Sequence, residues 1–413
     1  MGLRKVTQST VREDTNISLI IREVGRRICK SSNGRLWIAF FDFTTLDLRV
    51  AYSDDDGNSW TAEVVESFTS TIYPSVSLAI DSEDSLHLVY HLGETGTDKY
   101  MYYKKRSGGA WADRVTLDYN SSGGDISSIH VFVDVQDHIH VLWLGYDDTL
   151  ADYGIWYRQW DGSQVHYPWL SKETVSYISG KYPEACSGVV DSKGNIYCVF
   201  ISQGYGTYTA KYQAVYKKRD PSTGWGSAVL ITDINYDQWS VSVALESDGI
   251  VGVLWEGQGH GTNTGKDNMQ FNRVVHGVVQ TQESVTDSSD TQGAAILGYG
   301  NTLAVDKAGN YHAIWSGRTW GNNPTVASIQ QRKRAGGTWG TQEDLINEAY
   351  NQGVYSVLSA PYPDNQKLSE GYMFTYESFK AGGSDLEFYH RQHAPKGNQN
   401  VDQLIYQHVE KMD

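Results

Sequence analysis

The stretch DSEDSLHLVYHL, residues 81–92, joins an acidic turn to a run of alternating apolar residues, and this arrangement returns along the chain. The other copies are SSNGRLWIAFFD (31–42), DVQDHIHVLWLG (134–145), DSKGNIYCVFIS (191–202), ESDGIVGVLWEG (246–257), DKAGNYHAIWSG (306–317) and, more loosely, DNQKLSEGYMFTYES (364–378). The copies begin roughly 50 to 60 residues apart, and a further strand follows each one. This period, with about four short strands per unit, is typical of β-propeller blades. We therefore predict an all-β fold, a single seven-bladed β-propeller domain of four-stranded antiparallel blades over residues 1–413.

A closed ring needs its last blade to be paired, because an open edge would leave backbone groups without partners. Two apolar segments could supply the outer strand of that blade, NISLII (16–21) and DQLIYQHV (402–409). We expect either one to join the N- and C-terminal strands.

The composition agrees with an all-β chain and excludes several functions. Aromatic residues make up 12% of the chain, and 41 Gly stand beside only 8 Pro, which suits strands joined by tight turns. The formal net charge of −15 opposes binding to nucleic acid and anionic membranes, and no segment is long and apolar enough for membrane insertion. The N-terminal stretch lacks the apolar core of a signal peptide, so we expect cytoplasmic synthesis, with assembly into a virion left open.

No motif predicts a metal or a cofactor. His87, His140 and His312 occupy the same position in different copies, so a ring would hold them apart, and we interpret them as strand residues packed between blades. Three cysteines are too few for a disulfide framework. Cys186 and Cys198 flank one turn, where they either form a disulfide bond or remain buried thiols, which is the plainer interpretation.

One turn carries a family resemblance. In SDDDGNSW (53–60), the residues Ser53, Asp55, Gly57 and Trp60 match the pattern S-x-D-x-G-x-x-W, which resembles the Asp-box of the bacterial neuraminidase repeat (BNR) propellers. That superfamily includes sialidases, other glycosidases, propeller-type polysaccharide lyases and propellers without catalysis, some of them carried by phage particles. The resemblance implies a structural turn on the face opposite the active site.

The same resemblance directs attention to the loops that leave each second strand, since these would line a central funnel. They are rich in Gly, Thr, Asn, Asp, Tyr and Trp, which suits sugar binding. We predict that they contain ligand-binding residues, namely Tyr146, Asp147, His260, Arg318 and Trp320.

Catalytic candidates come from the position where each second strand ends. Glu256, Glu377 and His91 are its polar members, and a pair of carboxylates is what glycoside hydrolysis needs. Propeller-type lyases, by resemblance, use His and Tyr as acid and base, which would give these parts to His91 with Tyr146 or Tyr182. Arg26 and Arg27 depart from the sialidase arginine segment, and no set of three arginines emerges, which disfavours sialidase activity.

Basic runs at 104–106, 217–219 and 332–334 invite a polyanion-binding interpretation. They fall near the turn after the third strand, away from the funnel, where surface charge balance is the simpler interpretation.

Two classes of function remain. The first is a non-catalytic propeller that recognises a carbohydrate or a virion or host surface protein, and that is displayed on a virion. It is favoured by the missing signal peptide, the reduced cysteines and the incomplete catalytic sets. The second is a polysaccharide-acting enzyme, either a lyase or a glycosidase, with its site in the funnel.

Overall fold

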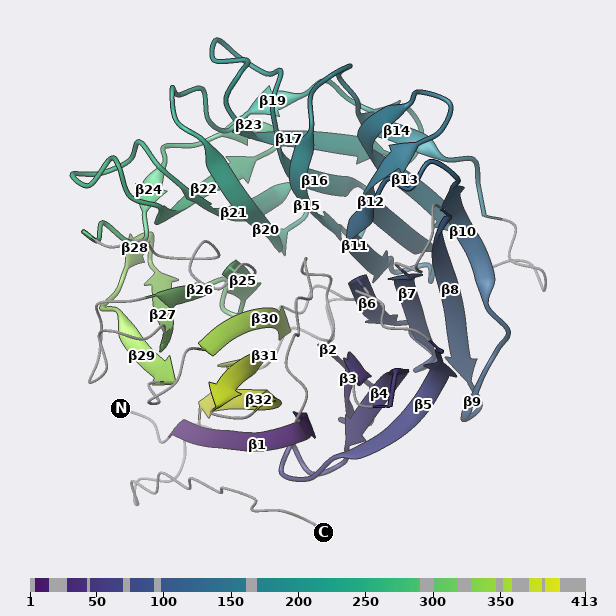
Figure 1. Cartoon of the computed structure of the whole chain (residues 1–413). Coiled ribbons are helices and arrows are strands. Elements are labelled where there is room, and N and C mark those ends of the chain that lie inside the picture. The colour runs from purple at the N-terminus through teal and green to yellow at the C-terminus, as the bar shows by residue number, and fades with distance from the viewer. Residues whose placement is uncertain are drawn as a thin grey trace.

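The computed structural model describes residues 4–14, 28–42, 45–69, 75–92, 98–160, 169–289, 301–317, 328–346, 352–358, 371–380 and 383–393. Within these residues all regular structure is β-strand, arranged in seven antiparallel sheets (Figure 1). Among them no helix has the length and hydrophobicity required to cross a membrane.

The sheets follow one another along the chain. Sheet 1 comprises β2 (Ile28–Lys30), β3 (Leu36–Asp42), β4 (Asp47–Ser53) and β5 (Thr61–Ser67), and sheet 2 comprises β6 (Ser75–Ile80), β7 (Leu86–Leu92), β8 (Lys99–Ser107), β9 (Ala110–Trp111) and β10 (Val115–Asn120). Sheet 3 comprises β11 (Ile126–Val133), β12 (Ile139–Asp147), β13 (Asp152–Trp160) and β14 (Glu173–Ser176), and sheet 4 comprises β15 (Pro183–Val190), β16 (Ile196–Ser202), β17 (Gln213–Asp220), β18 (Gly224–Trp225) and β19 (Val229–Leu230). Sheet 5 comprises β20 (Gln238–Ser247), β21 (Ile250–Gly257), β22 (Asn268–Val275), β23 (Val278–Val279) and β24 (Glu283–Ser284), and sheet 6 comprises β25 (Asn301–Val305), β26 (Tyr311–Gly317), β27 (Ser328–Ala335), β28 (Thr338–Trp339) and β29 (Glu343–Ile346). Sheet 7 comprises β30 (Gln352–Leu358), β31 (Gly371–Lys380), β32 (Gly383–His393) and β1 (Arg4–Asp14).

The sheets stand around a common axis. Their innermost strands β2, β6, β11, β15, β20, β25 and β30 contact one another in that order, and β30 in turn contacts β2 (Figure 1). The all-β propeller prediction is therefore confirmed.

Sheet 7 joins the two ends of the described chain. β1 pairs antiparallel with β32, from Arg4 opposite His393 to Asp14 opposite Ser384. Residues 4–14 therefore form the outer strand of this sheet, whereas the two segments predicted for it, 16–21 and 402–409, lie outside the described residues. β1 reads RKVTQSTVRED, a polar sequence that a search for apolar strands overlooks, although an outer strand needs few apolar residues.

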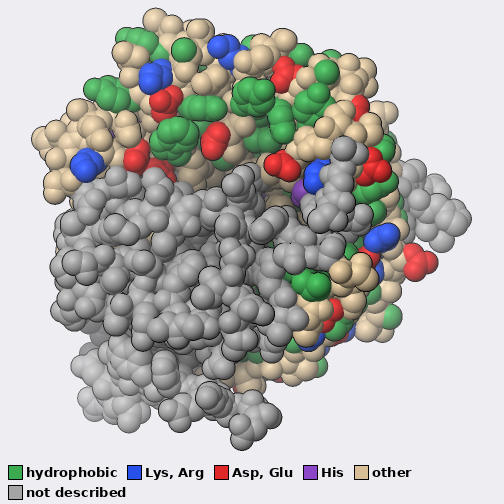
Figure 2. Space-filling view, in the orientation of Figure 1, with side chains coloured by type: hydrophobic (Ala, Val, Ile, Leu, Met, Phe, Trp, Pro, Cys, Tyr) green, Lys and Arg blue, Asp and Glu red, His purple; other side chains and the backbone are tan. Residues whose placement is uncertain are grey.

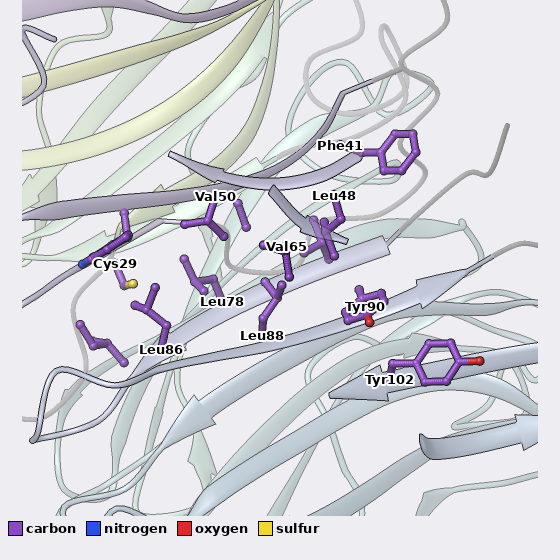
Figure 3. Packing of buried hydrophobic residues seen from close by; sticks show 14 residues of the cluster. Cys29, Phe41, Leu48, Val50, Val65, Leu78, Leu86, Leu88, Tyr90 and Tyr102 are labelled. Carbon is purple, nitrogen blue, oxygen red and sulfur yellow. The ribbon is translucent and has the colours of Figure 1, made fainter. Parts of the chain in front are cut away.

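Apolar side chains fill the space between neighbouring sheets. Val50 and Val65 of sheet 1 pack with Leu78, Leu86 and Leu88 of sheet 2 in one such cluster (Figure 3). Further buried clusters join sheets 2 and 3, sheets 3 and 4, sheets 4 and 5, and sheets 5 and 6. Cys29, Cys186 and Cys198 are buried and free, as the plainer interpretation predicted.

In four of the copies, the acidic turn binds the strand that follows it. Asp81 Oδ1 accepts the N–H groups of Glu83 at 3.0 Å and Ser85 at 2.7 Å, and its Oδ2 lies 3.0 Å from Nε2 of the buried His87. The equivalent pairs are His140 with Asp134 at 3.2 Å, His312 with Asp306 at 3.2 Å, and Tyr197 with Asp191 at 2.6 Å. The aligned histidines thus secure turns within their own sheets.

The same turns also bind to one another across sheets. Ser32 donates from its N–H and its hydroxyl to the two oxygens of Asp84, at 2.7 and 2.5 Å. Ser82 binds Asp137 in the same way, and Ser192 binds Asp248. These contacts join sheet 1 to 2, sheet 2 to 3, and sheet 4 to 5.

The basic runs form a second set of bonds between sheets. Lys217 donates to the carbonyl oxygen of Val175 at 2.7 Å, and Arg219 makes two bonds to Glu173 at 2.8 and 2.7 Å, so sheet 4 is tied to sheet 3. Residues 104 and 106 bind Val65 and Glu63 of sheet 1 likewise, and residues 332 and 334 bind Val285 and Glu283 of sheet 5. Several of these basic groups pair with carboxylates, as the charge-balance interpretation predicted, and Lys105 lies 3.4 Å from Asp81 of an acidic turn. The arginine pairs differ from that interpretation because they are half-buried and link neighbouring sheets.

The turn at 53–60 connects β4 to β5. Ser53 Oγ accepts the N–H of Gly57 at 2.8 Å and lies 2.7 Å from Asp55 Oδ1, which also accepts the N–H of Ser59 at 2.9 Å. Gly57 has a φ of 87°, which glycine adopts without strain. Trp60 is half-buried at the end of this turn.

Burial predicts a pH dependence of stability. It lowers the pKa of His87 and His140 below the ordinary value, so unfolding takes up protons once the pH falls below about 6.5. We expect the free energy of unfolding to fall on acidification by about 1.4 kcal/mol per pH unit for each histidine that gains a full proton. Urea unfolding at pH 7, 6 and 5 measures this slope. It should be shallower in His87→Gln and unchanged in His276→Gln, which alters an exposed histidine; equal slopes in all three proteins would contradict the expectation.

The bonds between sheets predict a difference between two ion pairs. Glu173→Gln weakens the link from sheet 3 to the buried Arg219, whose side chain is 11% exposed, and should cost about 1 to 3 kcal/mol. Asp54→Asn removes a pair with Arg35 that is 59% exposed on the aspartate side, and should cost under about 1 kcal/mol. Chemical denaturation of both variants checks the order, and an equal loss would show that the sheet-to-sheet bond contributes no more than a surface pair.

Candidate functional site

The antiparallel order of the strands gives the ring two different ends. At one end, which we call the loop face, the second strands end and the innermost strands begin. At the other, the turn face, lie the acidic turns and the turns that follow the third strands. The bonds between turns described above belong to the turn face, so they leave the loop face to other residues.

A line of five aromatic side chains crosses the loop face from sheet 3 to sheet 5, and we call it the aromatic row. It consists of Tyr146, Tyr153, Tyr182, Tyr212 and Trp239. Ring centroids are 5.3 Å apart for Tyr146 and Tyr153, 5.4 Å for Tyr153 and Tyr182, and 5.5 Å for Tyr212 and Trp239. Pro183 and Gln213 both pair with Ser202 of β16, so Tyr182 and Tyr212, which directly precede them in the chain, lie at the same end of sheet 4.

The row remains accessible to solvent. Tyr182 is 51% exposed, and its four companions are half-buried. Figure 2 shows carboxylate side chains scattered among hydrophobic ones, a class that includes tyrosine there, over the upper sheets of the ring. Exposed aromatic faces with polar groups between them suit a ligand that has both apolar and hydroxylated surfaces.

A bulge in β15 places Glu184 beside the row. The pairing of β15 with β16 shifts between Pro183 and Ala185, so Glu184 is the extra residue on that strand. β11 and β20, the innermost strands of sheets 3 and 5, also shift register near the loop face, and they contain Ser128 with φ 48° and Ser240 with φ 27°. Bulges of this kind re-aim side chains and are frequent beside active sites.

Glu184 differs from the other carboxylates around it. Its side chain is exposed, and the water that neighbouring protein atoms displace is enough to raise its pKa above the ordinary value. Within the described part of the chain it has no hydrogen-bond or ion-pair partner. Such a carboxyl group holds a proton more readily than an ordinary glutamate.

Asp237 follows Tyr212 in the chain, and both of its carboxylate oxygens have partners. Lys211 Nζ lies 3.0 Å from Asp237 Oδ2, and the N–H of Tyr212 donates to Oδ1 at 3.0 Å. Burial raises the pKa of Tyr212, and the charges of Glu184 and Asp237 raise it further. The Tyr212 hydroxyl therefore stays protonated.

The row includes one predicted ligand residue and excludes another. Tyr146 belongs to it, and Asp147 follows at the end of β12. Lys172 Nζ lies 2.6 Å from Asp147 Oδ2, and the N–H groups of Thr149 and Leu150 donate to Oδ1. Burial acts to raise the pKa of Asp147, but these bonds together lower it, so Asp147 holds its own loop.

His260 is buried, with both ring nitrogens engaged. Nε2 lies 3.0 Å from Gln238 Oε1 and Nδ1 lies 2.7 Å from Gln282 Nε2, and burial lowers the pKa to about 4. This places a neutral histidine inside the sheet, where it holds Gln238 next to Trp255. Arg318 and Trp320 lie outside the described residues.

The catalytic candidates from the sequence are not brought together at the row. Glu256 is fully buried near the end of β21, opposite Trp239 in the sheet. His91 is 4% exposed, and burial, helped by Lys99, lowers its pKa to about 3. Glu377 pairs with Gly353 through its backbone, and its side chain lies outside what the structure describes. The pattern of strand ends located these positions but did not show which side chains reach solvent.

The residues that were missed stand where innermost strands begin. The stretches SYISGKYPEA (176–185) and DINYDQWS (233–240) contain Glu184, Asp237 and Trp239, besides Tyr182, which the sequence indicated only as an alternative to Tyr146 beside His91. Their signal is aromatic and acidic residues directly before an apolar inner strand, whereas the sequence search followed only loops after the second strand. Among the described residues no group of three or more His, Cys, Asp or Glu side chains could hold a metal ion.

Comparison with known proteins identifies the fold. No protein-family profile and no curated protein matches the sequence. Among solved structures, an ulvan lyase bound to the fragment -[GlcA(1-4)Rha3S]- aligns with a TM-score of 0.59 at 10% identity, over 91% of this chain and 94% of that one. A protein of unknown function from Dyadobacter fermentans aligns with a TM-score of 0.52 at 12% identity, over 78% of this chain and 94% of that one. An α-L-arabinanase from Penicillium chrysogenum, complexed with arabinobiose, gives 0.50 at 12% identity, over 94% and 98%. The chain thus shares the fold of propeller-type glycosidases and lyases.

Proposed function

We propose that this protein binds a polysaccharide along the aromatic row and cleaves it there. The single observation that supports the proposal most is the row itself, five accessible rings in sequence across three sheets with an unpartnered carboxyl group beside them. Aromatic faces stack on the C–H surfaces of sugar rings, while the tyrosine hydroxyls and carboxylates bind sugar hydroxyls. The structures with the same fold include enzymes that act on polysaccharides, which agrees with this function.

A chain of sugars suits the row better than one sugar does. The centroids of successive rings lie 5.3 and 5.4 Å apart within sheets 3 and 4, and another pair lies 5.5 Å apart at the boundary of sheet 5. These rings continue from one sheet to the next, so a bound chain could contact several of them at once. Several weak stacking contacts then add to a useful affinity.

A second candidate is recognition of a glycan without cleavage, as a virion protein would need. It is favoured by the burial of His91 and Glu256, two of the three catalytic candidates from the sequence, and by the burial of His260, a predicted ligand-binding residue. In this function the row binds a carbohydrate on a host surface and leaves it intact. The two candidates differ in one observable, the appearance of new chain ends.

We expect Tyr182→Ala to weaken the binding of a polysaccharide roughly five- to tenfold, because one stacked ring contributes about 1 kcal/mol. Affinity electrophoresis in gels that contain single neutral or acidic polysaccharides measures retention, and a reducing-end assay on the same panel measures cleavage. Tyr119→Ala is the matched control, since Tyr119 is 44% exposed on the outer strand of sheet 2.

If Tyr182→Ala and Tyr119→Ala behave alike, the row is not the binding surface. If no polysaccharide is retained or cleaved by the unchanged protein, the proposed function is wrong. Retention without new chain ends favours the second candidate.

A further inference from the structure

The orientation of the rings in the aromatic row bears on the shape of the ligand. We infer that the polysaccharide bound there is a curved chain, in which each linkage turns the next sugar in the same direction, and not a flat, straight ribbon. The inference rests on the proposed function, because it names the class of polysaccharide that the same rings bind. It follows from how the rings are placed and tilted, which the sequence does not report.

Two pairs of rings lie at boundaries between sheets, and we call them the first and second platforms. The first platform is Tyr153 of β13 with Tyr182, which directly precedes β15, and their ring centroids are 5.4 Å apart. The second platform is Tyr212, which directly precedes β17, with Trp239 of β20, and their centroids are 5.5 Å apart. Each platform thus places a tyrosine of one sheet beside a ring at the start of the next sheet's innermost strand.

The tyrosines of the two platforms occupy the same position in successive sheets. Gly145 of sheet 3 and Ser202 of sheet 4 each pair with the first residue of the innermost strand of their sheet. On their other side, each pairs with the residue that directly follows the tyrosine of its sheet. Tyr153 and Tyr212 therefore have the same register, and the step from one sheet to the next relates one platform to the other.

That step is a rotation, because the sheets stand around a common axis (Figure 1). The described strands form seven sheets in a closed ring, so successive boundaries are turned by about one-seventh of a turn. A straight chain that lies along the first platform leaves the second platform to one side. A chain that curves in the direction of the ring can contact both.

The tilt of the rings leads independently to the same shape. The planes of Tyr153 and Tyr182 differ by 54°, and those of Tyr212 and Trp239 by 40°. Tyr146, at the end of the row in sheet 3, is turned by 77° from Tyr153. Stacking requires the face of a sugar to lie over the face of a ring, and a ribbon presents parallel faces from one sugar to the next. Tilted rings instead match sugars whose faces turn along the chain.

Contacts within the protein hold the rings of sheet 3 at their angle. Tyr146 and Tyr153 are direct partners in the pairing of β12 with β13, and the Tyr153 hydroxyl accepts the N–H of Asp125 at 3.2 Å. Tyr146 also packs closely on Gly124, where an added Cβ would lie 2.3 Å from Cβ of Tyr146. Because these contacts set the angle before a ligand arrives, a chain of matching shape binds with less loss of freedom.

Polysaccharides grouped by shape test the inference. Amylose and a β-1,3-glucan represent curved chains, and hydroxyethyl cellulose and a β-1,4-mannan represent ribbons. Every other polysaccharide that the protein retains is placed in one group by its linkage geometry. In affinity electrophoresis, the curved chain that binds best should be retained roughly tenfold or more tightly than any ribbon, because only a curved chain reaches both platforms. A ribbon retained as tightly as the best curved chain would overturn the inference while the proposed function stands.

Two substitutions test whether one chain spans both platforms. Tyr182→Ala removes a ring from the first platform and Trp239→Ala removes one from the second, and each should weaken retention of a curved chain roughly five- to tenfold. The double variant should weaken it roughly 25- to 100-fold, the product of the two effects, since each ring contacts a different sugar. If the double variant loses no more than a single variant does, the two platforms do not bind one chain and the inference is wrong.

Controls separate the loss of a ring from damage to the fold. Trp239→Phe keeps a ring at the second platform and should retain most of the affinity, and Tyr119→Ala, on the outer strand of sheet 2, should leave retention unchanged. Thermal unfolding checks that each variant is folded. A folded Trp239→Phe variant that binds as weakly as Trp239→Ala would count against stacking at this platform and overturn the inference. Failure of the unchanged protein to retain any polysaccharide would overturn the proposed function and this inference with it.

Discussion

The pairing of β1 with β32 is the contact on which the rest of the molecule depends. Among the described residues, sheets 2 to 5 each bury apolar side chains against both of their neighbours, so the position of one sheet depends on the sheets beside it. The antiparallel bonds from Arg4 to Asp14 bring the start of the chain onto its last sheet. Because β30 also contacts β2, the ring is closed and the angle between successive sheets is fixed. The side chains of the aromatic row, which come from sheets 3, 4 and 5, can then lie next to one another.

The two ends of the ring differ in the contacts that they make. At the turn face, Asp81 and its equivalents satisfy backbone N–H groups, and pairs such as Ser32 with Asp84 join neighbouring sheets. Farther out, Arg219 and its equivalents join sheets 2, 4 and 6 to the sheet before each one. Because these bonds hold neighbouring sheets in position, the loop face can contain bulges, serines with a positive φ and a Glu184 without a partner among the described residues. Such features cost stability where they stand and are retained where a surface has another task.

The repeat in the sequence predicted the fold because it consists of the residues that form the turns of the turn face and the strands next to them. An aspartate before a tight turn and an apolar strand after it are local requirements, and they recur with each sheet. The closing strand was not predicted, since RKVTQSTVRED pairs through its backbone and shows little apolar pattern.

The residues of the candidate site were not predicted for a different reason. Glu256 and His91 occupy the expected column, but alternation along β21 and β7 turns their side chains into the sheet packing, whereas Glu184 reaches the surface through a bulge that no periodicity reports. Asp237 and Tyr212 come into contact only when sheets 4 and 5 lie side by side.

The charges around the aromatic row affect which ligands it can bind. The chain has a net charge of −15, and two lysines near the row are paired with carboxylates, Lys211 with Asp237 and Lys172 with Asp147. The net negative charge opposes the approach of a strongly anionic ligand. Stacking on tyrosine and tryptophan needs no charge on the ligand. Burial raises the pKa of Tyr212, and the charges of Glu184 and Asp237 raise it further, so its hydroxyl stays protonated. The proposed binding of a polysaccharide therefore depends on stacking and hydrogen bonding rather than on attraction between opposite charges.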